Sequence, residues 1–399
     1  MSTEELIAQS ERYIMNTYRR FPIVLVRGEG SRVWDSDGKE YLDFVAGIAV
    51  CSLGHAHPKV VAAIKRQAEI LCHISNLYHI EPQIQVAKLL VECSFADKVF
   101  FCNSGAEANE GAIKLARRYG HEKSGEDRYE LITMKGSFHG RTLATLAATG
   151  QERFHAGFEP LPTGFRYVPF DDLRSLEEAV TEKTIGVMVE PIQGEGGVRI
   201  PSEDYLRGVR KICDEKKILL ILDEVQVGMG RTGPLFAHED YGIKPDIMTL
   251  AKAMGNGFPV GALLATEEVA DAFLPGTHAS TFGGNPLAMA AAVATLQTLL
   301  YDGVLENCRA VGAYFFQGLS SLKARFPFIE EVRGKGLILG VELNIDGQEI
   351  VDRCLEKGLL INCTAGNILR FVPPLTITKV EVDKGLDIIE GVLREVSGR

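Results

Sequence analysis

Short hydrophobic runs alternate with segments of helical periodicity between about Lys59 and Leu300. This alternation predicts an α/β fold, with a parallel sheet whose strands are joined by crossover helices. Sheets of this class bind ligands at the edge where their strands end. The expected strands are Lys98–Cys102, Glu130–Met134, Ile185–Val189, Ile218–Leu222, Asp246–Leu250 and Val260–Thr266.

The two ends of the chain follow a different pattern. Residues 32–44 alternate as a hairpin, residues 1–20 resemble a polar amphipathic helix, and residues 304–399 mix helices with strands such as Leu337–Leu343. We therefore expect a large ligand-binding domain over residues 59–300. The N-terminal segment 1–58 and a small C-terminal domain, 301–399, are expected to pack together.

Composition and charge narrow the class of protein. The 399 residues are 46% hydrophobic and 24% charged, and a net charge of -10 leaves no basic face for nucleic acid. Neither a signal peptide nor a run of about eighteen apolar residues is recognisable, so a cytoplasmic protein without a membrane partner is expected. Eight cysteines occur singly, and no spacing predicts a metal site.

An aspartate and a lysine follow two of the expected strands, Asp223 after Leu222 and Lys252 after Leu250. Such a pair can hold opposite ends of a flat cationic ring, and pyridoxal 5'-phosphate is a ring of this kind. A buried Asp223 would favour the protonated ring nitrogen, and a desolvated Lys252 would have a lowered pKa and form an imine with the cofactor. Either residue alone is more typical of a structural salt bridge.

Two other strand ends carry candidate contacts for the same ligand. A helix that begins with Ser104, Gly105 and Ala106 can offer free N–H groups to a phosphate, although a capping box at an ordinary helix start explains it equally. Phe138 could stack on the ring, although such a residue is more often part of the core. Only the presence of Asp223 nearby in the predicted fold favours the functional interpretation.

Five motifs in one order carry a resemblance to a known family: Ser104–Glu110, Ser137–Arg141, Leu222–Gln226, Ala251–Gly255 and Ser280–Pro286. In them the sequence resembles the class III pyridoxal phosphate-dependent aminotransferases. Further motifs are similar to the acetylornithine aminotransferase subfamily: Gly47–Pro58, Asn76–Tyr78, Val189–Gly197 and Leu369–Pro374. The resemblance spans essentially the whole chain.

The resemblance implies a fold type I enzyme with a mainly parallel seven-stranded sheet, working as a homodimer with its active sites at the interface. Lys252 and Asp223 are the implied catalytic residues. Arg141 and Ser280 are the implied contacts of the donor substrate. The implied cofactor contacts are Ser104, Gly105, Ala106, Phe138, Asp223, Glu224, Val225, Gln226 and Lys252, with Thr281 reaching the phosphate bound in the other subunit.

The implied reaction moves the terminal amino group of N2-acetylornithine to 2-oxoglutarate, in arginine biosynthesis. Two unlike substrates then share one pocket: Arg370 would bind the α-carboxylate of glutamate, and Glu195 would neutralise Arg370 while the donor reacts. Ornithine, succinylornithine and N-succinyldiaminopimelate remain alternative donors. A glutamate-1-semialdehyde aminomutase is the alternative outside transamination.

Overall fold

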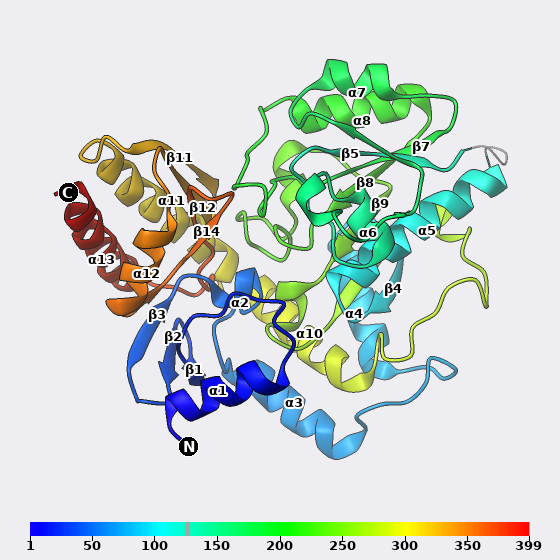
Figure 1. Cartoon of the computed structure of the whole chain (residues 1–399). Helices are drawn as coiled ribbons and strands as arrows, with labels where there is room; N and C mark the ends of the chain where they lie inside the picture. Colours follow the sequence, from blue (N-terminus) through cyan, green and yellow to red (C-terminus); the bar gives the residue numbers. More distant parts are fainter. Residues whose placement is uncertain (124–127, 399) are drawn as a thin grey trace.

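The computed structural model describes residues 1–123 and 128–398, and its largest sheet has seven strands (Figure 1). Its strand order is β4-β10-β9-β8-β7-β5-β6. Strand β10 is antiparallel to both of its neighbours, while the other pairings are parallel. Six strands therefore run in one direction. The strands are β4 (Lys98–Cys102), β5 (Glu130–Met134), β6 (Phe165–Val168), β7 (Thr184–Val189), β8 (Leu219–Asp223), β9 (Ile247–Leu250) and β10 (Gly261–Ala265).

Strand β8 illustrates why these hydrophobic runs become strands. Successive side chains point to opposite faces, so Leu220 and Leu222 pack with α7 and α8, whereas Leu219 and Ile221 pack with α5. Both faces are buried, which requires a nearly continuous hydrophobic sequence. The helices of this region are α3 (Pro58–Ile70), α4 (Glu81–Glu92), α5 (Gly105–Lys123), α6 (Leu143–Ala148), α7 (Leu173–Ala179), α8 (Tyr205–Lys216), α9 (Glu267–Ala270) and α10 (Pro286–Tyr301).

The α/β class with a mainly parallel sheet is confirmed, and the six expected strands are present within two residues at either end. Two features differ from the prediction. Strand β6 was not predicted, because at the edge of the sheet only Val168 of its four residues is buried. The opposite direction of β10 also departs from the simple alternation, since a strand pattern carries no sign of its direction.

Two four-stranded sheets flank the large one, with strand orders β1-β2-β3-β13 and β11-β12-β15-β14. The predicted hairpin is present as the antiparallel pair β2 and β3. Strand β13 pairs with β3 in parallel, so the two ends of the chain share a sheet. The strands are β1 (Leu25–Glu29), β2 (Arg32–Asp35), β3 (Glu40–Asp43), β11 (Ile329–Lys335), β12 (Ile338–Leu343), β13 (Leu359–Leu360), β14 (Asn362–Thr364) and β15 (Ile368–Phe371).

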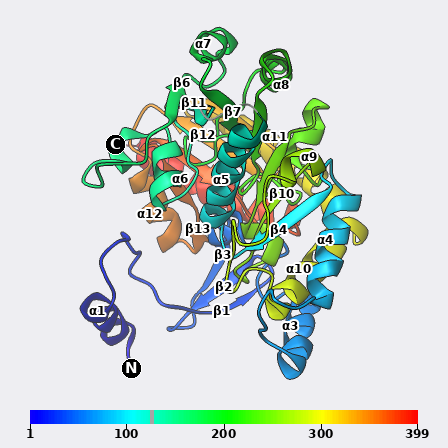
Figure 2. The same cartoon turned by 90° about the vertical axis from the view of Figure 1, so that its right-hand side faces the viewer.

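The remaining helices belong to the two ends of the chain. Helix α1 begins at a capping box on Ser2, ends earlier than predicted, and has no buried residue; Figure 2 shows it apart from the body. These helices are α1 (Thr3–Tyr13), α2 (Ala46–Ala49), α11 (Val304–Lys323), α12 (Gln348–Glu356) and α13 (Lys379–Ser397).

No single helix among the described residues is long and apolar enough to cross a membrane, although α10 and α11, bent by 65°, pass that test as a pair.

Candidate active site

The six strands of common direction end at one edge of the sheet, and a cavity of about 440 Å³ opens there. Residues that follow β4, β5, β7, β8 and β9 all contribute to its wall. Ten of the residues expected from the sequence therefore come together in one place. They are Ser104, Gly105, Ala106, Phe138, Arg141, Glu195, Asp223, Val225, Gln226 and Lys252.

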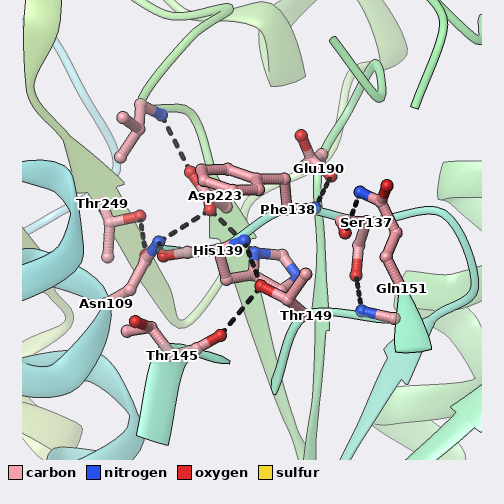
Figure 3. Close-up of polar contacts among 12 residues, drawn as sticks. Asn109, Ser137, Phe138, His139, Thr145, Thr149, Gln151, Glu190, Asp223 and Thr249 are labelled. Carbon is pink, nitrogen blue, oxygen red and sulfur yellow. Dashed lines mark hydrogen bonds and ion pairs between the residues drawn. The ribbon is translucent and has the colours of Figure 1, made fainter. Parts of the chain in front are cut away.

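Asp223, the last residue of β8, is held by hydrogen bonds from three sides (Figure 3). Its Oδ2 accepts from His139 Nδ1 and from Asn109 Nδ2, both at 2.8 Å, and its Oδ1 accepts from the Val225 N–H at 3.0 Å. Asn109 is fixed in turn by Thr249, whose hydroxyl donates to Asn109 Oδ1 at 2.7 Å. We call these five residues the Asp223 network.

The Asp223 network is buried and presents its carboxylate to the cavity in one orientation. Asp223 is 4% exposed and Asn109 1%, so few other geometries are open to them. Asn109 Nδ2 also donates to the His139 carbonyl at 2.7 Å, which ties α5 to the segment after β5. The sequence analysis had assigned no function to His139, Asn109 or Thr249, although the first two lie inside its motifs.

Lys252 begins the 3-10 helix η3 (Lys252–Gly255) directly after β9, and lines the cavity together with Asp223. Its φ of 45° lies in the left-handed region, which is strained for a residue with a side chain. Burial lowers the pKa of Lys252, and the nearby Arg370 lowers it further, whereas Glu195 opposes the shift. A larger fraction of neutral amine follows, which is the form that attacks a carbonyl group.

The start of α5 forms a pocket for an anion. The Glu107 N–H donates to Ser104 Oγ and the Ala108 N–H to the Ser104 carbonyl, so the N–H groups of Gly105 and Ala106 have no partner within the described chain. A Cβ at Gly105 would lie 2.6 Å from Val225 Cγ1, so only glycine fits this approach of helix to strand. Free N–H groups and the helix dipole together favour a phosphate here.

The segment that carries Phe138 is fixed by side chains rather than by a sheet (Figure 3). Glu190 Oε2 accepts from the Phe138 N–H at 3.0 Å, and Thr149 Oγ1 accepts from the His139 N–H at 2.9 Å. Glu190 lines the cavity and is 6% exposed; burial, and then the charge of Asp223, raise its pKa well above the ordinary value. No function was expected of Glu190, although it lies in the Val189–Gly197 motif and directly after β7.

An ion pair joins Glu195, a half-buried residue of the cavity wall, to Arg370 in the interior. Arg370, fully buried in β15, donates through Nη1 to Glu195 Oε1 at 2.6 Å, and Gln226 Nε2 donates to the same oxygen at 3.3 Å. Burial pushes the pKa of Glu195 up, but Arg370 and Lys252 outweigh it, so the net pKa is lowered. We call Arg370 and Glu195 the Arg370 pair.

Four expected contacts lie outside the cavity wall. One is Arg370, which is joined to it through Glu195, and the others are Glu224, Ser280 and Thr281. The Glu224 carboxylate accepts from the N–H groups of Ala237 and His238, so the structure corrects the expectation that this side chain faces the ligand. Ser280 Oγ accepts from Asn103, a cavity residue, at 3.3 Å, and Thr281 beside it is exposed.

Comparisons with known proteins agree with this geometry. Residues 13–393 match the family described as Aminotransferase class-III. The chain is 57% identical to an acetylornithine aminotransferase of Caldanaerobacter subterraneus subsp. tengcongensis, over 98% of this chain and 100% of that one.

Two solved structures have closely similar folds. An N-acetylornithine aminotransferase from Stenotrophomonas maltophilia K279a superimposes with a TM-score of 0.84 at 41% identity, covering 98% of this chain and 100% of the other. An ornithine aminotransferase from Toxoplasma gondii, described with partial occupancy of PLP at its active site, gives 0.96 at 36% identity, covering 100% and 96%.

Proposed function

The chain belongs to the class-III aminotransferases, and from this premise we propose that it moves the δ-amino group of N2-acetyl-L-ornithine to 2-oxoglutarate, giving N-acetyl-L-glutamate 5-semialdehyde and L-glutamate. It is a pyridoxal 5'-phosphate enzyme of fold type I. The observation that carries the proposal is the single cavity shared by Lys252, Asp223 and the start of α5. The proposed setting is arginine biosynthesis in the cytoplasm.

The residues around the cavity fit pyridoxal phosphate. The unpartnered N–H groups of Gly105 and Ala106 suit its phosphate, the Asp223 carboxylate suits a protonated ring nitrogen, and Phe138 offers an aromatic face. When bound, the cofactor accepts the electrons released at the donor carbon. Asp223 favours this because a carboxylate next to the ring nitrogen stabilises its positive charge.

Lys252 is the residue that moves the proton in this proposal. Its lowered pKa keeps a neutral amine available to take the proton from the donor's δ-carbon and to return it on the cofactor side. Asp223, held by His139, Asn109 and Val225, stays in place throughout.

The two substrates require two carboxylate sites. We assign Arg141 to the α-carboxylate of the donor, because its guanidinium lines the cavity and has no acidic partner within the described chain. Arg370 is assigned to the α-carboxylate of glutamate or 2-oxoglutarate. Glu195 neutralises Arg370 while the donor reacts, and the glutamate carboxylate replaces it afterwards.

A homodimer is part of the proposal, with Thr281 contacting the cofactor phosphate in the partner's site. Two adjoining segments support it: Asn76 Nδ2 donates to the carbonyls of Ser280 and Gly283, and the surface around them is apolar. Leu77 is 83% exposed and Phe282, next to Thr281, is 60% exposed, so two large apolar side chains lie open to a partner chain in this proposal.

A mixing experiment tests the dimer. Lys252→Ala and Thr281→Ala each damage a different half of a shared site, so mixed dimers regain one intact site. We unfold the two variants together and refold them. The activity of the mixture should then rise in proportion to the fraction of dimers that contain one chain of each variant. No recovery, with light scattering showing a monomer, would reject the shared site.

The donor is tested by a single-turnover survey of the loaded enzyme. N2-acetylornithine, ornithine, succinylornithine, N-succinyldiaminopimelate and 4-aminobutyrate are each added in excess, and the absorbance change of the cofactor is followed. We expect the largest kcat/KM for N2-acetylornithine. Ornithine is the alternative that an observation favours, namely the fold shared with the Toxoplasma gondii enzyme; a larger kcat/KM for ornithine would replace the proposal.

A further inference from the structure

Arg141 is held at the cavity by an aromatic ring that has no assigned function. Its Cζ lies 4.0 Å from the centre of the Phe154 ring and 5.5 Å from that of Phe138. The two rings meet edge to face, with centroids 5.9 Å apart at an angle of 83°. Phe154 ends the 3-10 helix η1 (Glu152–Phe154), one turn beyond α6, and is half-buried.

Phe154 is the main restraint on an otherwise free guanidinium. Within residues 1–123 and 128–398, Arg141 makes no hydrogen bond or ion pair, and its side chain is exposed. Arginine loses considerable rotamer freedom when it binds a carboxylate, and a flat aromatic face restricts that freedom in advance. The guanidinium is therefore oriented while its hydrogen-bond donors stay available.

Phe154 belongs to the same hydrogen-bonded unit as Phe138. Gln151 Nε2 donates to the Ser137 carbonyl at 2.9 Å, as Figure 3 shows, and the Phe154 N–H donates to the Gln151 carbonyl at 3.0 Å. His155 Nε2 donates to the Thr149 carbonyl at 2.8 Å, which anchors the far side of the turn. The ring under Arg141 and the ring beside the cofactor are thus fixed relative to each other.

A second guanidinium shares the Phe154 ring. Arg153 Cζ lies 4.7 Å from the ring centre, and its Nη2 donates to Gln151 Oε1 at 2.9 Å. Neither arginine has a carboxylate within ion-pair distance in the part of the chain that the structure describes. Glu110, on the facing helix α5, is engaged by the Thr142 hydroxyl and the Ala144 N–H.

Two unpaired cations on one ring create a positive potential beside the place proposed for the donor's α-substituents. That potential attracts an α-carboxylate and repels a free α-ammonium group. An acylated α-nitrogen is neutral and is not repelled. The charge pattern therefore separates acylated from free diamino acids without any contact to the acyl group.

We propose that Phe154 is a positioning residue for substrate specificity, whose ring holds Arg141 and Arg153 where they favour donors with an α-carboxylate and an acylated α-nitrogen. This inference rests on the proposed function, because it places the donor's α-carboxylate at Arg141.

The test compares Phe154→Leu, which removes the aromatic face, with Phe154→Tyr, which keeps it. For N2-acetylornithine we expect Phe154→Leu to raise KM about tenfold with kcat within about twofold, and Phe154→Tyr to restore the wild-type KM. For N-acetylputrescine, which lacks the α-carboxylate, KM should be unchanged. Arg153→Gln should lower the preference for N2-acetylornithine over ornithine about threefold.

Phe165→Leu is the matched control, because Phe165 carries Arg117 at 5.2 Å in the same kind of contact but lies outside the cavity wall. It should leave every KM unchanged. Equal rises of KM for both acetylated donors in Phe154→Leu, or a fall of kcat alone, would overturn the inference. Wild-type turnover of N2-acetylornithine tests the proposed function separately, and the Phe154→Leu shift can be measured on whichever α-carboxylate donor the enzyme uses.

Discussion

The Asp223 network and the Arg370 pair both hold a buried charge at the cavity, but they hold it in opposite ways. Asp223 accepts only from His139, Asn109 and a backbone N–H, each of them buried or part of the main chain. Arg370 is equally buried, yet its main partner Glu195 has a side chain 29% exposed, on the segment after β7.

The difference reflects what each charge must do. A ring nitrogen stays in one place through both halves of a transamination, so a fixed acceptor with several fixed donors serves it best. A carboxylate site that is filled by one substrate and empty for the other needs a partner that can leave. A set of fixed hydrogen-bond donors therefore suits the cofactor end, and an exchangeable ion pair suits the substrate end.

The largest loss of kcat is expected for a substitution of Lys252, because the charges of both Asp223 and the Arg370 pair act on its amine. Lys252→Ala removes the amine that takes the proton, so we expect kcat to fall by about 10⁴ or more, and the visible absorption of the linked cofactor to disappear. Circular dichroism should show an unchanged fold. A variant that keeps both colour and turnover would remove the basis of the comparison.

The Asp223 network is broken next by Asp223→Asn, which keeps the shape and removes the charge. We expect kcat to fall by about 10² to 10³, because the ring nitrogen loses its anionic partner. Asn109→Ala removes one neutral donor only, and about a tenfold loss is expected. Reconstitution of Asp223→Asn with N1-methylated pyridoxal phosphate, whose ring is permanently cationic, should recover part of the rate; no recovery would argue that Asp223 acts only on packing.

Some of these site residues could be predicted from the sequence, and others could not. The end of β8 could be predicted because a long hydrophobic run stops at a charged residue, and Asp223 follows at once. His139 follows no such run. Glu190 does follow one, directly after β7, but its hydrogen bond from the Phe138 N–H depends on which loops meet above the sheet. The pairing of Arg370 with Glu195, 175 residues apart, was reached only through the resemblance, because no local pattern encodes a contact between segments so distant in the sequence.

Glu195→Gln removes the negative charge of the Arg370 pair and leaves the Asp223 network intact. The half-reaction with N2-acetylornithine should lose about tenfold more rate than that with glutamate, because glutamate itself brings the carboxylate that Arg370 needs. Equal losses in the two half-reactions would contradict the exchange. For the same reason, 2-oxoglutarate should raise the Tm of Glu195→Gln by more than it raises that of the wild type.

The pH dependence of the free energy of unfolding tests independently how strongly the Arg370 pair favours the ionised form of Glu195. The pKa of Glu195 is lowered below the ordinary 4.5, so its ionised form is favoured by folding. Its contribution is present above that pH and is lost as the pH falls through the folded pKa. Glu195→Gln should therefore differ from the wild type most at neutral pH, and the difference should shrink in acid.

The smallest effect is expected for Glu190. Its contribution to stability changes with pH in the opposite direction to that of Glu195, because burial and Asp223 raise its pKa. The folded protein then binds a proton that the unfolded chain releases above about 4.5, so this group makes the free energy of unfolding fall as the pH rises through that window. Glu190→Gln cannot ionise yet can still accept from the Phe138 N–H, so it should gain stability relative to the wild type as the pH rises.

Glu190→Ala loses that acceptor, and its affinity for the cofactor should weaken by about fivefold. Denaturant unfolding of the cofactor-free proteins at pH 5 and 8, with cofactor titrations at pH 8, separates these outcomes. A glutamine variant that binds the cofactor as weakly as the alanine variant would mean that Glu190 works as an anion, and that the cofactor end of the cavity depends on the charge of Glu190 as well as on the hydrogen bonds around Asp223.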